Sequence, residues 1–296
     1  MGKLSKNMVT LSRQGGGSFK TVADRMKLAE RFALRLQSLN IQIRNFSNIK
    51  TRHIQLYIES RKAEKLNIRT LQNEMSAMRT LLRVSGKPKL ADPQHEKLSN
   101  KALGISGSSR GGTKQAISDD VFHAIHNKVL AKDPGAAAIM ELSRQLGLRT
   151  EEAIQSVKSL KTWQKAIIRG DEKVRVIFGT KGGRTRDTTI LQRERLLEAV
   201  NNAIRIAAER NGKLIDKPAL HLAIECYRNI VRDAGMSGKN APHSLRYAYT
   251  RDVVDLHKER GFSQKEAEAL ASMDLGHGDG RGHYVARVYN RESEDE

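Results

Sequence analysis

Six side chains in the second half of the chain are of types that could together act on a phosphodiester bond. An arginine donates to two phosphate oxygens at once and keeps its charge at any working pH. A histidine can donate a hydrogen bond or move a proton, a lysine ammonium can protonate a leaving oxygen, and a tyrosine hydroxyl can act as a nucleophile. In chain order these residues are Arg149, Lys181, His243, Arg246, His277 and Tyr289.

Each of these residues, taken singly, also has an ordinary structural explanation. Arg149 could bind the last carbonyls of an apolar helix, with Glu152 as its local partner. Lys181 lies in a glycine-rich turn, where a lysine is normally solvated. His243 and Arg246 are three residues apart, so they project from one face of a helix, as many such pairs do. Residue types alone therefore leave the function open.

A second interpretation of the C-terminal histidines is a zinc site. His277 and His283, with Asp274 and Asp279, could supply nitrogen and oxygen ligands. The segment is short and rich in glycine, however, and it contains no H-E-x-x-H helix. The single cysteine, Cys226, excludes a cysteine-based zinc site and an intrachain disulfide. We therefore expect neither a metal nor another cofactor.

The candidate residues must be held by a mixed domain, which the sequence predicts from residue 117 to 291. Ser118 is a plausible N-cap, and Asp119 and Asp120 follow it at the positive end of a helix. Alternating apolar and basic residues around a glycine-rich turn predict a β-hairpin over residues 173–190. Helical spacing predicts helices at about 119–131, 136–148, 191–210, 217–233, 245–260 and 263–273.

The first part of the chain repeats apolar residues at helical spacing, with basic residues between them. This pattern predicts a small helical bundle with a basic face. Prolines, glycines, serines and lysines then give residues 85–116 the composition of a linker. The chain is therefore expected to be mainly α with a small β-sheet, an α+β protein. Its expected parts are a flexible basic arm at 1–20, the helical bundle at 21–84, the linker at 85–116, the mixed domain at 117–291 and an acidic tail at 292–296.

The composition favours duplex DNA as the partner. The net charge is +20, from 53 Lys and Arg against 33 Asp and Glu, and basic side chains that neutralise phosphates release counterions. Aromatic residues make up only 4% of the chain, which argues against stacking platforms for single strands. No apolar run approaches the roughly 20 residues of a membrane span, and the polar N-terminus lacks a secretion signal. The cytoplasm is the expected compartment.

The order of the short motifs resembles that of the tyrosine recombinase, or phage integrase, family. In this order come Gly-Leu-Arg149-x-x-Glu152, Gly-Thr-Lys181-Gly-Gly, His243-x-x-Arg246, Leu-Gly-His277 and the C-terminal Tyr289. The resemblance covers about residues 20 to 291. It implies a helical core-binding domain that binds DNA at 21–84 and a tyrosine recombinase catalytic domain at 117–291.

What the resemblance implies about activity is a DNA strand transferase that needs neither metal nor ATP. Tyr289 would attack the scissile phosphate and form a 3′-phosphotyrosine intermediate. Arg149 and Arg246 would bracket the two non-bridging oxygens, and Glu152 would position Arg149 from behind. The covalent bond would store the energy of the broken linkage, so that a 5′-hydroxyl could later reverse the step.

The resemblance also implies roles for the remaining residues and for partners. Lys181 would protonate the leaving 5′-oxygen, His243 would assist the tyrosine, and His277 would donate to the phosphate. Partners would be duplex recombination sites, three further protomers in a homotetramer on two sites, and a directionality factor. The enzyme would be encoded by a bacterium or a phage and would integrate or excise a mobile element.

The chain departs from the family pattern near its C-terminus. Tyr247 follows Arg246, where the family commonly has a histidine. Tyr289 is twelve residues after His277, whereas the family's nucleophile usually follows by about nine. Tyr284 is seven residues after His277 and is the alternative nucleophile. Tyr289 is the expected one because Val-Tyr-Asn-Arg follows a short apolar and basic run, as in the family.

Two other functions stay open at this point. A type IB topoisomerase-like or telomere-resolving strand transferase would use the same residues on one duplex. A non-catalytic DNA-binding regulator would hold its sites without cutting them. Exchange of strands between two DNA molecules distinguishes a recombinase from the first alternative, and a covalent protein–DNA adduct distinguishes it from the second.

Overall fold

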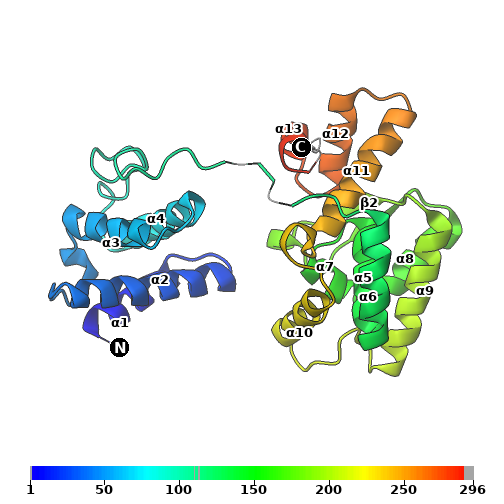
Figure 1. Cartoon of the computed structure of the whole chain (residues 1–296), viewed down its shortest axis with the longest axis horizontal. Helices are drawn as coiled ribbons and strands as arrows, with labels where there is room; N and C mark the ends of the chain where they lie inside the picture. The colour runs from blue at the N-terminus through cyan, green and yellow to red at the C-terminus, as the bar shows by residue number, and fades with distance from the viewer. Residues whose placement is uncertain (1, 110, 113, 290–296) are drawn as a thin grey trace. The chain divides into compact units, whose positions relative to one another are not determined.

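The computed structural model describes residues 2–109, 111–112 and 114–289 and divides the chain into two compact units. The first unit runs from Met1 to Ser109 and the second from Arg110 to Glu296. Both are mainly helical, and the strands described form one two-stranded sheet in the second unit (Figure 1). The expected fold class, mainly α with a small β-sheet, is confirmed. The acidic tail expected at 292–296 lies outside the described residues.

The first unit is a small helical bundle around one apolar core. Ser18 and Asn67 cap two of its helices, since each side chain accepts a backbone N–H of the first turn. Phe32, Phe46 and Tyr57 pack edge to face in the centre. The helices are α1 (Lys3–Gln14), α2 (Phe19–Ser38), α3 (Thr51–Ala63) and α4 (Ile68–Val84), with a short 3-10 helix at Phe46–Asn48.

The expectation of a flexible arm at residues 1–20 is wrong, because most of that segment is helix α1. Leu4, Met8 and Leu11 recur at helical spacing and are buried in the core of the first unit. The helix packs against α2 and α4. Arg25 of α2 donates to the carbonyls of Ser12 and Gly16 and so fixes the turn between α1 and α2. The amphipathic spacing therefore outweighs the polar composition of the segment.

The expected linker at 85–116 is also longer than the segment that joins the two units. Leu98, Leu103 and Ile105 are buried in the core of the first unit. Arg79 donates to the carbonyl of Leu98 at 3.0 Å, and Gln72 donates to the carbonyl of Ile105 at 2.8 Å. Residues up to about 105 are therefore packed in a series of turns, and the chain divides after Ser109.

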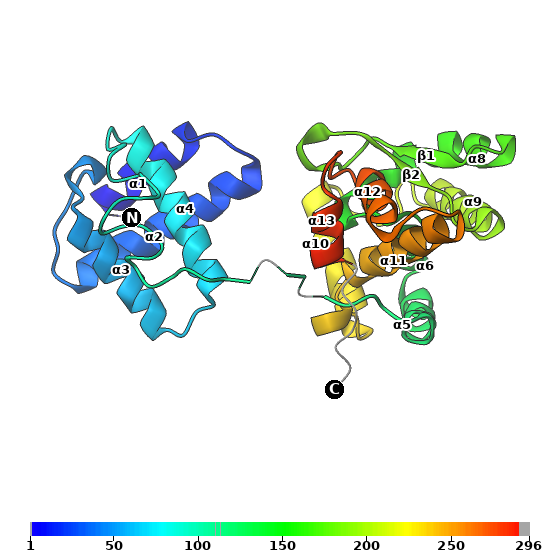
Figure 2. The same ribbon diagram turned by 90° about the horizontal axis from the view of Figure 1, so that it is seen from above.

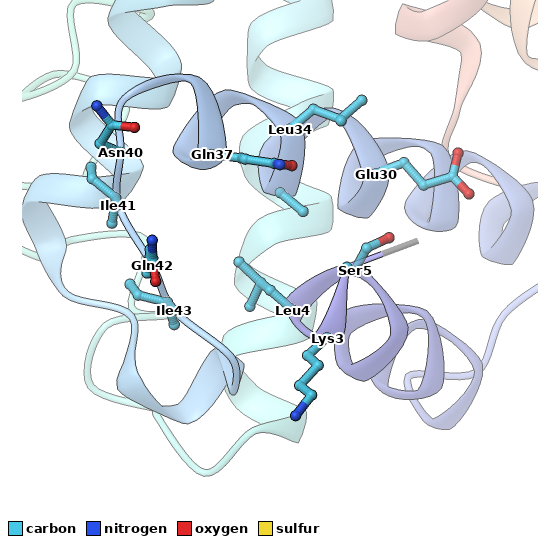
Figure 3. A pocket seen from close by; sticks show the side chains of 12 residues that line it. Lys3, Leu4, Ser5, Glu30, Leu34, Gln37, Asn40, Ile41, Gln42 and Ile43 are labelled. Carbon is cyan, nitrogen blue, oxygen red and sulfur yellow. The ribbon is translucent and has the colours of Figure 1, made fainter.

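A pocket of the first unit lies between the start of α1, the side of α2 and the segment that follows α2 (Figure 3). Apolar side chains line it (Leu4, Leu34, Ile41 and Ile43), together with charged and polar ones (Lys3, Glu30 and Gln37).

The second unit packs nine helices of the described residues around the hairpin and a large apolar core. Asp133 caps one helix by accepting the N–H of Ala136, and Ser263 opens another with a capping box to Glu266. Figures 1 and 2 show α12 and α13 side by side. The helices are α5 (Asp119–Lys132), α6 (Pro134–Leu146), α7 (Thr150–Gln155), α8 (Leu160–Arg169), α9 (Arg193–Glu209), α10 (Leu220–Asp233), α11 (Ser244–Glu259), α12 (Gln264–Asp274) and α13 (Gly282–Val288).

The hairpin consists of strands β1 (Lys173–Val176) and β2 (Arg186–Thr189), paired antiparallel. Directly opposite residues of such a pair point to the same face. Val176 is buried and pairs with Arg186, so Arg186 also faces the protein interior.

In the described part of the chain, no helix is long and apolar enough to cross a membrane.

Candidate active site

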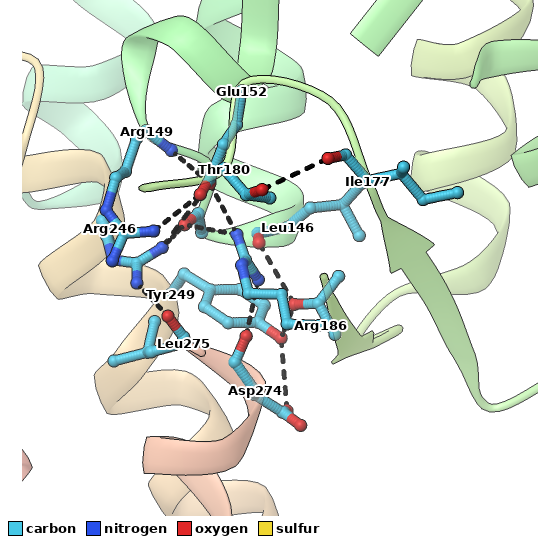
Figure 4. Close-up of polar contacts among 12 residues, drawn as sticks. Leu146, Arg149, Glu152, Ile177, Thr180, Arg186, Arg246, Tyr249, Asp274 and Leu275 are labelled. Atoms are coloured by element: carbon cyan, nitrogen blue, oxygen red, sulfur yellow. Dashed lines mark hydrogen bonds and ion pairs between the residues drawn. The ribbon is translucent and has the colours of Figure 1, made fainter. Parts of the chain in front are cut away.

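A fully buried carboxylate, that of Glu152, lies at the centre of the site (Figure 4). It belongs to α7, which begins directly after Arg149. Arg149 donates to it twice, from Nη1 to Oε1 at 2.6 Å and from the backbone N–H to Oε2 at 2.9 Å. Burial raises the pKa of Glu152, but Arg186, Arg246 and Arg149 outweigh burial and lower the pKa to about 2. The carboxylate is therefore ionised and fixes Arg149 at the start of α7.

Arg246 lies in the first turn of α11 and is completely buried. One of its Nη atoms donates to the carbonyl of Gly147, after α6, and the other donates to the carbonyl of Leu275, after α12. Burial, with the neighbouring Arg186, lowers the pKa of Arg246 to about 10, so the group remains charged at neutral pH. Arg246 therefore joins the ends of two helices, with Glu152 Oε2 3.8 Å from its Nη1.

A third arginine, Arg186, is buried in the same cluster and was not among the residues expected from the sequence. Its Nη2 donates to Glu152 Oε2 at 2.8 Å and to the carbonyl of Gly147 at 3.3 Å. Its Nη1 donates to the carbonyl of Asp274. Its inward position follows from the strand pairing, because a residue opposite the buried Val176 must face inward, and the sequence alone does not give that register.

Tyr289 and His243 meet beside this cluster. The Tyr289 hydroxyl lies 3.3 Å from His243 Nε2, and the Tyr289 side chain is buried. His243 directly precedes α11, so the helix that holds Arg246 also holds the histidine. Burial, followed by the charges of Arg246 and Arg149, lowers the pKa of His243 to about 4. The imidazole is therefore neutral at neutral pH and can accept the hydroxyl proton.

His277 completes a cluster of rings around Tyr289. The centroids of the His277 and Tyr289 rings are 5.8 Å apart, and those of Tyr247 and Tyr289 are 4.6 Å apart. Tyr284 packs edge to face on His277 at 4.9 Å. Burial, followed by Arg246 and Arg149, lowers the pKa of His277 to about 3. Its Nε2 is buried without a hydrogen-bond partner, so a donor or acceptor is free for a ligand.

Lys181 is the one expected residue that the structure does not bring into contact with the others. It is exposed at the tip of the hairpin, and within the described residues it makes no hydrogen bond or ion pair. The base of the tip is fixed, because a Cβ on Gly179 would lie 2.6 Å from the carbonyl oxygen of Glu151. Gly182 and Gly183 beyond it have positive φ and open space around them.

The arginine cluster carries three positive charges against one carboxylate, which is an arrangement suited to an anion. Neither histidine adds a charge at neutral pH. Arg149 is the most exposed of the three arginines, at 26%, and its positive charge also lowers the pKa of His243 and of His277. Asp274, one of the four side chains of the zinc interpretation, accepts a hydrogen bond from Lys173 Nζ at 2.8 Å. Among the residues that the structure describes, no three His, Cys, Asp or Glu side chains are arranged to hold a metal ion.

Comparison with known proteins relates the chain to integrases. The family model described as "Integrase" matches residues 104–252, half of the chain, and that described as "Phage integrase, N-terminal" matches residues 1–91. A comparison with curated proteins found no match. Among solved structures, a lambda integrase dimer bound to a COC′ core site has a TM-score of 0.61 and 14% identity, over 99% of this chain and 78% of that one. The two matched models show that the chain belongs to the phage integrase family of tyrosine recombinases, the site-specific enzymes that cleave and rejoin DNA.

Proposed function

We propose that Tyr289 is the nucleophile with which this recombinase cleaves duplex DNA. The observation that carries the proposal is the contact of the Tyr289 hydroxyl with His243 Nε2 at 3.3 Å. A neutral imidazole at that distance can take the proton as the phenolic oxygen attacks. A phosphate bound to the arginines would raise the low pKa of His243, because its negative charge favours the protonated ring. Tyr284, by contrast, has its ring against His277, whereas the rings that contact His243 within the described residues are those of Tyr247 and Tyr289.

Arg149 and Arg246 would hold the two non-bridging oxygens of the scissile phosphate. Glu152 orients Arg149 through a bond of 2.6 Å, and helix α11 carries Arg246 beside the nucleophile's partner. Preorganised donors of this kind contribute on the order of 3–4 kcal/mol each to a transition state that gains negative charge. His277 would add a further donor through its unpartnered Nε2.

Lys181 would supply the proton for the leaving oxygen. In the step, a bond forms between the Tyr289 oxygen and phosphorus, and the bond from phosphorus to the 5′-oxygen breaks. The 5′-oxygen takes its proton from the Lys181 ammonium, and His243 takes the phenolic proton. The exposed hairpin tip would have to move onto the DNA to do this, and the two glycines after Lys181 leave it free to do so.

The assembly that fits this chemistry is a homotetramer on two duplex sites, because each exchanged strand needs its own nucleophile. Such an enzyme would integrate or excise a mobile element, with a directionality factor deciding between the two, and would be encoded by a bacterium or a phage. The strand-transfer product distinguishes this function from a topoisomerase-like activity on a single duplex.

The test is trapping of the covalent intermediate. A binding site is first selected from random-sequence duplexes by affinity for the protein, and a nick is then placed beside the cleavage position so that the released fragment diffuses away. We expect a covalent adduct in EDTA and without ATP, with the nucleotide on Tyr289 in peptide mass spectrometry. An adduct on another residue, or no adduct on any selected site, would contradict the proposal.

A further inference from the structure

Arg186 connects three segments that carry the proposed catalytic residues. Its guanidinium donates to Glu152 of α7, to the carbonyl of Gly147 after α6, and to the carbonyl of Asp274 at the end of α12 (Figure 4). The side chain is only 2% exposed. A charge that is buried so completely is costly unless it is paired and hydrogen-bonded. Loss of these contacts would leave the Arg186 charge buried and unpaired, so the contacts are strongly favoured.

The aliphatic part of Arg186 supports the turn that presents His277. A Cβ placed on Gly276 would lie 2.9 Å from Cδ of Arg186 and 3.4 Å from its Cβ. Gly276 also has a φ of +68°, a conformation that favours glycine. The turn from Leu275 to His277 therefore lies directly on the Arg186 side chain, and both the backbone conformation and the close approach require glycine there.

Arg186 and Arg246 make parallel connections. Both donate to the carbonyl of Gly147, and they donate to the neighbouring carbonyls of Asp274 and Leu275. If a phosphate takes over donors of Arg246, Arg186 still joins the same two helix ends. The second arginine would then keep the surrounding segments in place while the first binds a substrate.

The same junction ties in the hairpin that bears Lys181. The carboxylate of Asp274 accepts the N–H of Thr189 in β2 at 3.2 Å and the ammonium of Lys173 in β1 at 2.8 Å. Both strands are thus held to the end of α12, where Arg186 also binds. A change at this junction would move the hairpin and the His277 turn together.

We propose that Arg186 is a positioning residue of the recombinase site, which acts through Glu152 on Arg149 and through Gly276 on His277. This inference rests on the proposed roles of Arg149, Arg246 and His277. Arg186 is assigned no contact with DNA. Loss of the Arg186 side chain should therefore slow strand cleavage without weakening DNA binding.

The test compares Arg186→Gln and Arg186→Lys in single-turnover cleavage of the nicked substrate at saturating protein, with the DNA dissociation constant measured in parallel. A displacement of reacting groups by about 1 Å lowers rates on the order of 100-fold, and we expect a loss of that size for Arg186→Gln with unchanged DNA affinity. Arg186→Lys should fall between this variant and the unmodified protein, because lysine keeps the charge and one hydrogen bond.

Arg210→Gln is the matched control. Arg210 also donates to a carboxylate, Asp133 Oδ1 at 2.8 Å, and to a carbonyl, that of Leu214 at 3.0 Å, but these residues are not part of the site. This variant should lower the resistance to denaturant while each folded molecule cleaves at the normal rate. Fluorescence of Trp163, the single tryptophan, measures the folded fraction of the second unit.

Each outcome decides the matter. Normal cleavage by folded Arg186→Gln overturns the positioning role and leaves the proposed function intact. A loss of DNA affinity that parallels the loss of cleavage also overturns it, since Arg186 would then serve DNA binding. An equal loss of cleavage rate in the Arg210 control, or failure of both Arg186 variants to fold, overturns it as well, since Arg186 would then serve stability alone. If the unmodified protein forms no adduct at Tyr289, the proposed function itself fails.

Discussion

The hydroxyl of Tyr289 lies 3.3 Å from Nε2 of His243, although 46 residues separate the two in the chain. The contact joins a residue just after α13 to one just before α11, and it places the proposed nucleophile in the site of its own chain. The histidine is neutral there because burial and two arginines lower its pKa to about 4.

This relationship predicts that Tyr289→Phe abolishes the covalent adduct while DNA binding is retained. The substitution removes only the attacking oxygen, and the ring can still pack between Tyr247 and His277. Gel separation of the trapped adduct and a binding titration measure the two properties. Tyr284→Phe is the matched control and should still form the adduct. A nucleotide attached to Tyr284 would reverse the assignment of the two tyrosines.

For Lys181, we predict a defect that depends on the leaving group. Lys181→Ala should lose cleavage of the normal linkage, because the 5′-oxygen departs without a proton. A substrate with sulfur in place of that bridging oxygen needs no such proton, so cleavage rates on it should recover. Arg149→Ala should recover far less on the same substrate, since its defect concerns the non-bridging oxygens. Equal failure of both variants on the sulfur substrate would remove Lys181 from the acid role.

The free energy of unfolding should fall at acid pH because of Glu152. Its pKa is about 2 in the folded protein against 4.5 ordinarily, and at 1.36 kcal/mol per pKa unit this corresponds to about 3 kcal/mol of stability. Because the folded pKa is the lower one, this contribution is complete above pH 4.5 and is lost as the pH falls through the folded value of about 2. Glu152→Gln should remove it and leave buried arginines unpaired, which costs about 3–5 kcal/mol at pH 7.

Denaturant titrations followed by Trp163 fluorescence measure this free energy of unfolding at pH 7 and at acid pH. Glu151→Gln is the control, because Glu151 is the exposed neighbouring carboxylate on the same short helix. It should change the free energy of unfolding little. A Glu152→Gln protein as stable as the unmodified one would show that the arginines do not depend on this carboxylate.

DNA affinity should depend steeply on salt. With a net charge of +20, we expect phosphate contacts to dominate binding, so the logarithm of the affinity should fall linearly with the logarithm of the salt concentration. The slope should be about −0.9 for each phosphate that the protein neutralises. Fluorescence anisotropy of a labelled duplex at several salt concentrations measures it. A flat response would mean that non-ionic contacts carry the binding.

Local patterns were sufficient for most of the second unit. The helices expected at 119–131 and 136–148 lie at Asp119–Lys132 and Pro134–Leu146, and the hairpin expected over 173–190 lies at Lys173–Thr189. Apolar spacing and turn residues act over a few positions, so they can be read without knowledge of the fold. The short helices α7, α8 and α13 were missed, because six to ten residues offer too few turns for a clear period.

The missing parts of the site depend on distant pairings. Arg186 faces inward only because of its register opposite Val176, and the intervening loop hides that register in the sequence. On a continuous helix Tyr284 and Tyr289 would point about 140° apart. The helix ends at Val288, however, and the ring centroids of the two tyrosines are 6.1 Å apart. The inward position of Arg186 and the closeness of the two tyrosine rings therefore follow from tertiary packing and not from local spacing.

Helix α1 has a practical consequence for anyone who wishes to study the DNA-binding half of the protein alone. Leu4, Met8 and Leu11 cover apolar side chains of α2 and α4. A fragment that starts at residue 21, where the sequence pattern places the bundle, would leave that surface open to water. Exposed apolar patches of this kind promote aggregation, so a fragment intended to remain monomeric must retain Lys3 and the turns that run to Ile105.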